Sequence, residues 1–529
     1  MDPSGILTIL GLVVAVFAII PRERRLDLSI RISNLDWLII VATLILVHYI
    51  IYFSVLKELG LAFELGSWRY GFNEENTIYL IFLGLGIFLI FRAKVSKITR
   101  SNIDSANDLF EQLLLEEKYG ELTILTERHI NYISKIYKSD SYLNQIANKI
   151  RPTESFSMYL GNQKPSYLDS FLPKQRVWIS SLIERGDDKK EIAENILRRL
   201  VNNVGFVRHL SISRPYLGIQ IIETDTYFIE DFVINFFNNL MENETSVYYY
   251  ELEDTQNLVS GSRYGLSKNN KLLYYLFNNV KVSETLGIYK PIGDKVCNLL
   301  DYDKKLIARY NEPLGTYYES NRFRCPIDSS VHFFEIMILE SMHQGIRWHM
   351  WLYYFPSFVT KILDKLDPAP GVDIDREWPT PFHYILYHTV SVMLDWLEEY
   401  SKVANKDPLQ MDDERLHHDN GSIPKSTVLA LGNIIFMIIS SPAVSNQFKE
   451  YILEIVFRYL RNNQHDVSQQ QINRVLMNSI LRNGFHNELK VNYIIKLIEI
   501  YENIDHIIRS ELKEFEVLLD SAKLELGLV

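Results

Sequence analysis

The sequence lacks most of the residue patterns by which enzymes of the common classes are recognised. It has only two cysteines in 529 residues, Cys297 and Cys325, which are too few for a disulfide framework or a cysteine-rich zinc site. So few cysteines also fit a reducing compartment. The dinucleotide fingerprint, the P-loop, the H-E-x-x-H step and the G-x-S-x-G elbow are all absent. We assign no catalytic residue and expect a binding or effector role rather than catalysis.

An excess of basic residues is also missing. The net charge is −11, and residues 1–102 carry ten basic and eight acidic side chains, so the rest of the chain carries −13. An acidic body argues against a broad nucleic-acid footprint, so nucleic acid is not an expected partner. The chain is 47% hydrophobic and 12% aromatic, which excludes a disordered protein.

Charged residues are absent from three long apolar runs near the N-terminus, at about 5–20, 37–56 and 77–91. At roughly 1.5 Å of rise per residue, each run approaches the ~30 Å needed to cross a bilayer. We therefore predict three transmembrane helices within an anchor formed by residues 1–102. Two alternatives are a cleaved signal peptide for the first run and buried core helices for all three.

Basic residues flank these runs asymmetrically. They follow the first and the third run, at Arg22, Arg24, Arg25, Arg31, Arg92, Lys94, Lys97 and Arg100. Because Lys and Arg remain on the cytoplasmic side, we expect the N-terminus outside and the chain after about residue 100 in the cytoplasm. The expected location is the inner cell membrane, with several spans. A signal peptide would carry its basic residues before the apolar run, so the charge order favours a span.

The remaining chain predicts a mainly α protein with one mixed insert. Residues 103–204 show amphipathic helical spacing, beginning with an αα-hairpin near residues 105–137. In 205–326 the runs at 206–213, 217–223 and 246–253 are rich in β-branched and aromatic residues. They predict strands, and thus a small mixed α/β domain with a βαβ unit.

Residues 327–529 predict an all-helical domain. Apolar residues recur with helical spacing in about five segments after residue 424, at intervals of about twenty residues. Such spacing is typical of stacked helical hairpins, either an α-solenoid or an irregular bundle.

The stretch HFFEIMILESMH contains the strongest candidates for chemistry. Helical geometry places four polar side chains of this stretch within one arc, and a following segment offers two more histidines. These candidate metal ligands are His332, Glu335, Glu340, His343, His383 and His388. Imidazole and carboxylate ligands together suit Zn, Fe or Mn. The alternative is a core helix whose polar groups pair with one another, because buried polar groups need partners rather than a metal.

A modest basic cluster offers a second, weaker candidate site. Its members are Arg198, Arg199, Arg208, His209 and Arg214. They would suit a phosphate-bearing ligand. The alternative is a solvated face whose cations pair with acidic neighbours.

From these features we expect a membrane-tethered cytoplasmic sensor–effector, in the manner of bacterial stress or antiviral (antiphage) defence proteins. Its partners would be the lipid bilayer, further copies through self-association of the spans, and a partner protein or small-molecule signal. Two alternatives stay open at this point. One is a membrane-anchored scaffold that binds partner proteins, and the other is a membrane-bound metalloenzyme.

Overall fold

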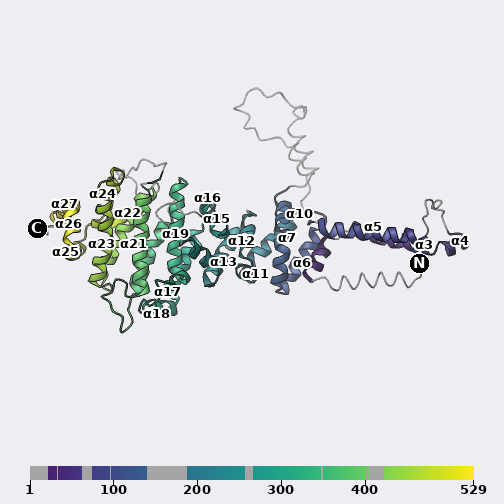
Figure 1. The fold of residues 1–529 in the computed structure, drawn as a ribbon, viewed down its shortest axis with the longest axis horizontal. Coiled ribbons are helices and arrows are strands. Elements are labelled where there is room, and N and C mark those ends of the chain that lie inside the picture. Colours follow the sequence, from purple (N-terminus) through teal and green to yellow (C-terminus); the bar gives the residue numbers. More distant parts are fainter. Residues whose placement is uncertain are drawn as a thin grey trace, which may run out of the picture. The chain divides into compact units, whose positions relative to one another are not determined.

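The computed structural model describes residues 22–31, 34–61, 74–95, 97–139, 188–224, 226–256, 266–346, 350–400, 402–403 and 422–528. Within these ranges the chain forms helices and connecting turns and no strand (Figure 1). The prediction of a mainly α protein is confirmed. The chain divides into two compact units, Met1–Ile229 and Glu230–Val529. The first apolar run, 5–20, lies outside the described residues, and the finer division into four domains stays a prediction.

The first unit begins with an apolar helical hairpin and continues into amphipathic helices. Its described helices are α2 (Arg22–Arg31), α3 (Asn34–Ile51), α4 (Phe53–Glu58), α5 (Glu74–Val95), α6 (Ile103–Leu115), α7 (Tyr119–Lys138), α10 (Asp188–Asn202), α11 (Val204–Ser213) and α12 (Pro215–Ile222). The predicted αα-hairpin is confirmed as α6 and α7, and α10 packs against both. The three helices bury their apolar faces together, as their amphipathic spacing requires.

The second unit is a succession of helices that mostly contact their neighbours in the chain. Its α-helices are α13 (Ile229–Glu242), α14 (Val247–Gln256), α15 (Lys271–Phe277), α16 (Val280–Leu286), α17 (Tyr289–Tyr302), α18 (Lys304–Tyr310), α19 (Pro326–His343), α20 (Tyr354–Lys365), α21 (Pro381–Tyr400), α22 (Ile423–Ser440), α23 (Asn446–Asn462), α24 (Val467–Leu481), α25 (Val491–Asn503), α26 (His506–Glu511) and α27 (Lys513–Glu525). Short 3-10 helices join some of them, at Asn321–Arg324, Met350–Tyr353 and Gly484–His486. The helices from α22 onward match the segments that the apolar spacing predicts.

The prediction of a mixed α/β domain at 205–326 is wrong for the described residues. The three predicted strands at 206–213, 217–223 and 246–253 are the helices α11, α12 and α14. Pro215 occupies the first turn of α12, where its fixed φ angle and missing N–H favour helix entry. Short apolar runs are ambiguous between strand and buried helix, and here the tertiary packing decides for helix.

The tyrosine run in α14 shows why a strand does not form. Tyr248 and Tyr249 are adjacent, yet both are fully buried, whereas Tyr250 is exposed. A strand would turn successive side chains to opposite faces, so two neighbours would not share one buried face. The further buried residues Leu252 and Thr255 continue the helical spacing. The aromatic preference for strands is therefore overridden by the burial of one helical face.

Helix α22 is the most apolar element of the second unit and lies in its core. Within the described residues it is the one helix long and apolar enough to cross a bilayer, but 67% of it is buried against other helices. It packs against α20, α21 and α24. Shorter apolar stretches at Asp36–Ile51 and Glu75–Phe91 belong to α3 and α5.

The crossing of α22 and α24 depends on Gly432. A Cβ atom at this position would lie 2.1 Å from Ser479 Oγ and 2.6 Å from the Ser479 backbone. We expect Gly432→Ala to cost about 1–3 kcal/mol in the free energy of unfolding, because the helix backbones must separate. Chemical denaturation of the purified protein measures this. Gly120→Ala is the matched control, since a Cβ atom there meets nothing within 4 Å. Equal stability of the two variants would contradict the prediction.

Candidate functional site

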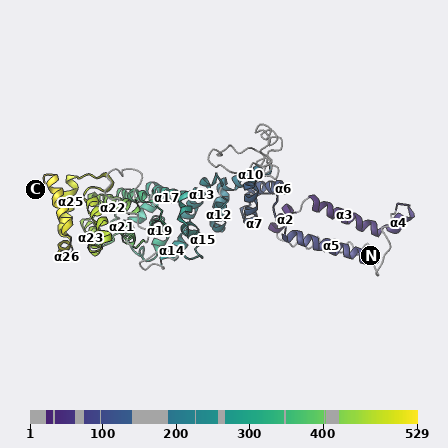
Figure 2. The ribbon, with the colours of Figure 1, turned by 90° about the horizontal axis from the view of Figure 1, so that it is seen from above.

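The apolar helices α3 and α5 form an antiparallel hairpin. Val47 and Ile50, near the end of α3, pack against Ile78 near the start of α5. Figure 2 shows the two helices side by side, with α4 at the far end. Backbone hydrogen bonds run on from α3 into α4, with Tyr52 N–H donating to His48 O at 3.0 Å. The second apolar run is thus almost entirely helical, from α3 through α4.

Polar groups inside α3 are satisfied by the helix itself. The hydroxyl of Thr43 donates to the carbonyl of Ile39 at 2.7 Å, and Nδ1 of His48 lies 2.8 Å from the carbonyl oxygen of Leu44. A bilayer core offers no water, so spanning helices must satisfy such groups internally. The imidazole of His48, within the second run, is therefore held by the backbone one turn earlier.

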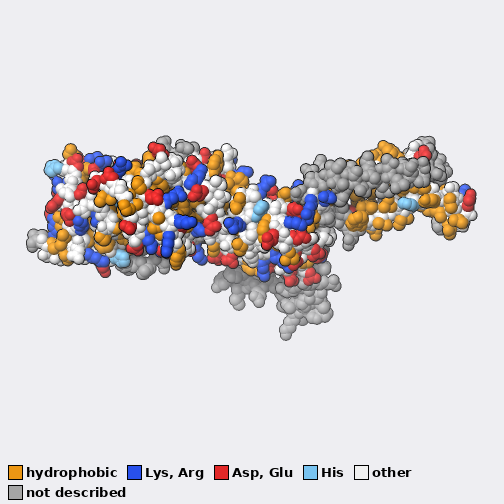
Figure 3. Space-filling view, turned by 90° about the horizontal axis from the view of Figure 1, so that it is seen from below, with side chains coloured by type: hydrophobic (Ala, Val, Ile, Leu, Met, Phe, Trp, Pro, Cys, Tyr) orange, Lys and Arg blue, Asp and Glu red, His pale blue; other side chains and the backbone are white. Residues whose placement is uncertain are grey.

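The outer surface of the hairpin is apolar. Among the described residues, thirty large hydrophobic side chains are exposed, and half of them lie on α3 to α5 and the turn after α4. They are Trp37, Leu38, Val41, Ile45, Leu46, Tyr52, Val55, Leu59, Leu61, Tyr79, Leu80, Leu83, Ile87, Ile90 and Phe91. Figure 3 shows hydrophobic side chains along the part of this segment that is in view. A contiguous apolar surface of this kind marks a membrane or partner interface.

A buried carboxylate lies where this hairpin meets the amphipathic helices. Asp27, in α2, is 5% exposed and accepts hydrogen bonds from Arg31, Arg128 and His129. The distances are 2.7 Å to Arg128 Nη1 and 2.6 Å to His129 Nε2. Burial alone would raise the pKa of Asp27, but the hydrogen bond from His129 and the charge of Arg31 lower it below its usual value. We call these four residues the Asp27 junction.

A second contact strengthens the attachment of α2. The side-chain amide of Asn102 donates to the carbonyl of Ile30 at 2.9 Å, and its oxygen accepts from Thr99 N–H at 2.6 Å. Helix α2 also contacts α5, α6 and α7. It therefore links the end of the apolar hairpin to the αα-hairpin through buried polar contacts rather than through a free linker.

The candidate metal ligands occupy two neighbouring helices, α19 and α21, but form separate pairs. The contacts are His332 Nδ1 to Glu335 Oε2 at 2.6 Å, His343 Nε2 to Glu399 Oε1 at 3.0 Å and His388 Nδ1 to Asp328 Oδ1 at 2.6 Å. In the part of the chain that the structure describes, no group of three or more His, Cys, Asp or Glu residues is placed to hold a metal ion. The arrangement is that of a core helix with paired polar groups.

The two remaining candidates have partners of their own. Glu340 accepts a hydrogen bond from Gln344 Nε2 at 3.0 Å, and His383 Nδ1 lies 2.8 Å from Thr380 Oγ1. Burial lowers the pKa of His383 to about 4, so this imidazole is neutral near pH 7. In contrast, Asp328 outweighs the effect of burial on His388 and raises its pKa.

The basic cluster is spread over three places in the first unit. Arg198 and Arg199 lie on α10, Arg208 and His209 on α11, and Arg214 at the end of α11. Carboxylates already neutralise the first two, with Arg198 Nη2 2.6 Å from an oxygen of Glu194 and Arg199 Nη1 2.6 Å from one of Glu111. These pairs correspond to the alternative of a solvated, paired face. A ligand site at this cluster stays a prediction.

The sequence patterns do not predict the Asp27 junction, although one residue in the sequence indicates it. Asp27 is an acidic residue within a segment that otherwise reads as a positive flank of a membrane span. Its partners Arg128 and His129 lie about a hundred residues later, and only the fold brings them together.

Comparison with protein families, with curated proteins and with solved structures finds no match for this chain.

Proposed function

We propose that this protein is a membrane-anchored sensor–effector, whose helical cytoplasmic body receives a signal and acts on the membrane through its apolar spans. The exposed apolar surface of α3 to α5 is the observation that carries this proposal. Such a surface gains most free energy in a lipid environment. Three spans, including the run at 5–20, an outside N-terminus and an inner-membrane location complete the proposal, with basic flanks on the cytoplasmic side.

The Asp27 junction favours an effector over a passive anchor. A scaffold needs only a tether, and a tether can be a flexible linker. Here a buried carboxylate and the Asn102 contact hold α2 to α5, α6 and α7. A shift of the αα-hairpin would therefore move the membrane helices. Self-association of the spans would be needed to perturb the bilayer, since a single copy offers too few helices for a pore. Stress and antiphage defence proteins use this layout, which supports that setting by analogy only.

Induced expression in a bacterial host tests the proposal. We expect the full-length protein to depolarise the inner membrane, measured with a potential-sensitive dye together with entry of an impermeant DNA stain. The variant Ile45→Lys with Ile87→Lys, expressed to the same level, should leave the potential intact because lysines on the lipid-facing surface oppose insertion. Intact membranes with both proteins would contradict an effector that acts on expression and would favour the anchored scaffold.

A further inference from the structure

A polar pocket lies in the second unit, where the end of α22 meets the first turns of α23 and α25. Its volume is about 460 Å³, and no acidic residue among those described lines it. The polar side chains that line it are Ser440, Ser441, Asn446, Lys449, Asn492 and Lys496. The composition of hydroxyl, amide and ammonium groups supplies hydrogen-bond donors and positive charge but no carboxylate.

Lys449 is the unusual member of this pocket. It is 4% exposed, and within the described residues it makes no side-chain hydrogen bond and no ion pair. Burial, and then the nearby charge of Lys496, lower the pKa of Lys449. The Lys449 side chain lines the pocket and is otherwise buried, so an anion that entered the pocket would be the direct partner of its ammonium group. The pocket is the space in which that anion would lie.

The starts of two helices add positive potential. Helix α23 has 17 residues and begins at Asn446, with the Ser445 hydroxyl capping one of its N–H groups. Helix α25 has 13 residues and begins at Val491 without a side-chain cap. The first turn of each helix contributes to the pocket lining, through Asn446 and Asn492. Unpaired N–H groups and the helix dipole at such ends favour bound anions, and phosphate above all.

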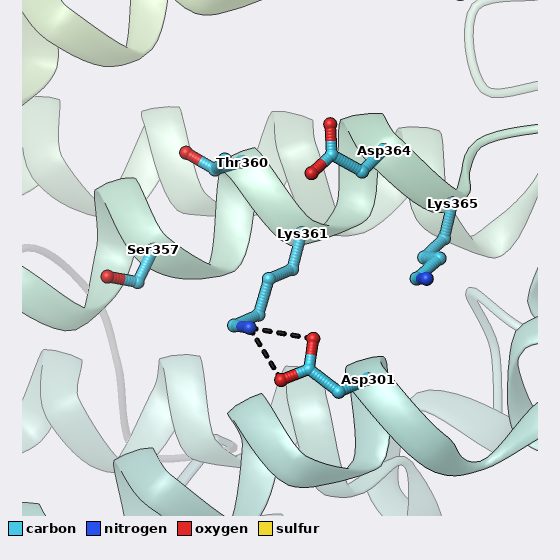
Figure 4. A pocket seen from close by; sticks show the side chains of 6 residues that line it. All are labelled: Asp301, Ser357, Thr360, Lys361, Asp364 and Lys365. Carbon is cyan, nitrogen blue, oxygen red and sulfur yellow. Dashed lines mark hydrogen bonds and ion pairs between the residues drawn. The ribbon is translucent and has the colours of Figure 1, made fainter.

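Glu499 is the carboxylate whose charge acts on Lys449, and it is already engaged. It accepts from Lys496 Nζ at 2.9 and 3.0 Å and from the Asn446 amide at 3.2 Å. Its charge acts on Lys449 only from beyond ion-pair distance. Another pocket of the same unit makes the contrast: there Lys361 Nζ contacts both oxygens of Asp301, at 2.7 and 2.6 Å (Figure 4).

We infer that the Lys449 pocket binds a soluble small molecule through a phosphate group. Lys449, the two helix starts and the Ser441 hydroxyl would surround the phosphate oxygens, and Lys496 would divide its contacts between the ligand and Glu499. A volume of about 460 Å³ leaves room for an organic group beyond the phosphate. We take this pocket to be the ligand site of the sensor, so the inference rests on the proposed function.

Thermal unfolding of the purified full-length protein in detergent tests the inference, with inorganic phosphate and pyrophosphate as probes at constant ionic strength. We expect a saturable rise in Tm with either probe that chloride does not reproduce. Lys449→Met should weaken the apparent affinity about 10- to 100-fold, the range for losing one hydrogen bond to a charged group. It should also raise the Tm of the ligand-free protein, because burial of the Lys449 side chain disfavours its charged form.

Lys361→Met is the matched control, since it removes a lysine whose carboxylate partner is present. It should leave the phosphate response unchanged. Lys449→Arg, which keeps the charge, should retain part of the response. No saturable response in the wild type, or the same response in Lys449→Met, would overturn the inference. Binding only to vesicles containing phosphatidylglycerol would overturn a soluble ligand. These measurements use purified protein, so their failure is distinct from a failure to depolarise membranes.

Discussion

Replacing Ile45 and Ile87 together by lysine is expected to keep the α3–α5 hairpin from inserting into the membrane. Both side chains point outward from the hairpin, with 64% and 61% of their surface exposed. A lysine at the middle of a spanning helix costs roughly 2.5–3.5 kcal/mol of insertion free energy, so the pair costs about 5–7 kcal/mol.

The position of the hairpin tip reports insertion. A Leu59→Cys substitution in a Cys297→Ser background places a thiol just after α4, which our topology puts outside the cytoplasm. An impermeant maleimide should label this thiol in intact spheroplasts, and the two lysines should reduce labelling at least about tenfold, given their insertion cost. Lysines at Ile212 and Ile507, which are 58% and 61% exposed on α11 and α26, are the matched control and should change nothing. Tip labelling that persists in the lysine variant would refute insertion of the hairpin.

Whether the sequence predicts a helix of this protein correctly depends on the length of the apolar pattern in that segment. Long amphipathic segments such as Tyr119–Lys138 and Asn446–Asn462 reveal their helices because apolar residues recur over several turns. The short runs at 206–213, 217–223 and 246–253 do not, since each is compatible with a buried strand or a buried helix. Their neighbours in space, which a single sequence does not reveal, decide between the two.

The candidate sites show the same limit. The spacing of His332, Glu335 and His343 correctly places them on one helix. It does not reveal that His332 pairs with Glu335 while His343 pairs with Glu399 on α21. Lys449 is unremarkable in the sequence, as one basic residue in an amphipathic helix. Its burial without a partner follows from the meeting of α22, α23 and α25, of which the last two are separated in the chain by α24. Whether a polar or charged side chain has a partner is therefore decided by the fold and not by the local sequence.

Asp27→Asn is expected to loosen the attachment of the α3–α5 hairpin to α6 and α7 without preventing its insertion. The amide keeps the shape of the carboxylate but loses its charge, so Arg31, Arg128 and His129 share one neutral acceptor oxygen in place of two charged ones. Breaking a buried ion pair costs about 3 kcal/mol or more, and hydrogen exchange of the α2 and α7 amides would measure this local loss. Asp104→Asn is the control, because its exposed pair with Lys189 should contribute no more than about 1 kcal/mol.

The Asp27 junction also predicts that the protection of α2 depends on pH and that depolarisation depends on Asp27. Because the folded-state pKa of Asp27 lies below its usual value of 3.8, its contribution to stability is complete above that value and is lost as the pH falls below it. Acid should therefore weaken α2 protection in the wild type but not further in Asp27→Asn.

If the junction transmits the signal, Asp27→Asn should abolish depolarisation while the Leu59→Cys tip stays labelled from outside. Undiminished depolarisation by this variant would show that the spans act without a rigid connection to α7.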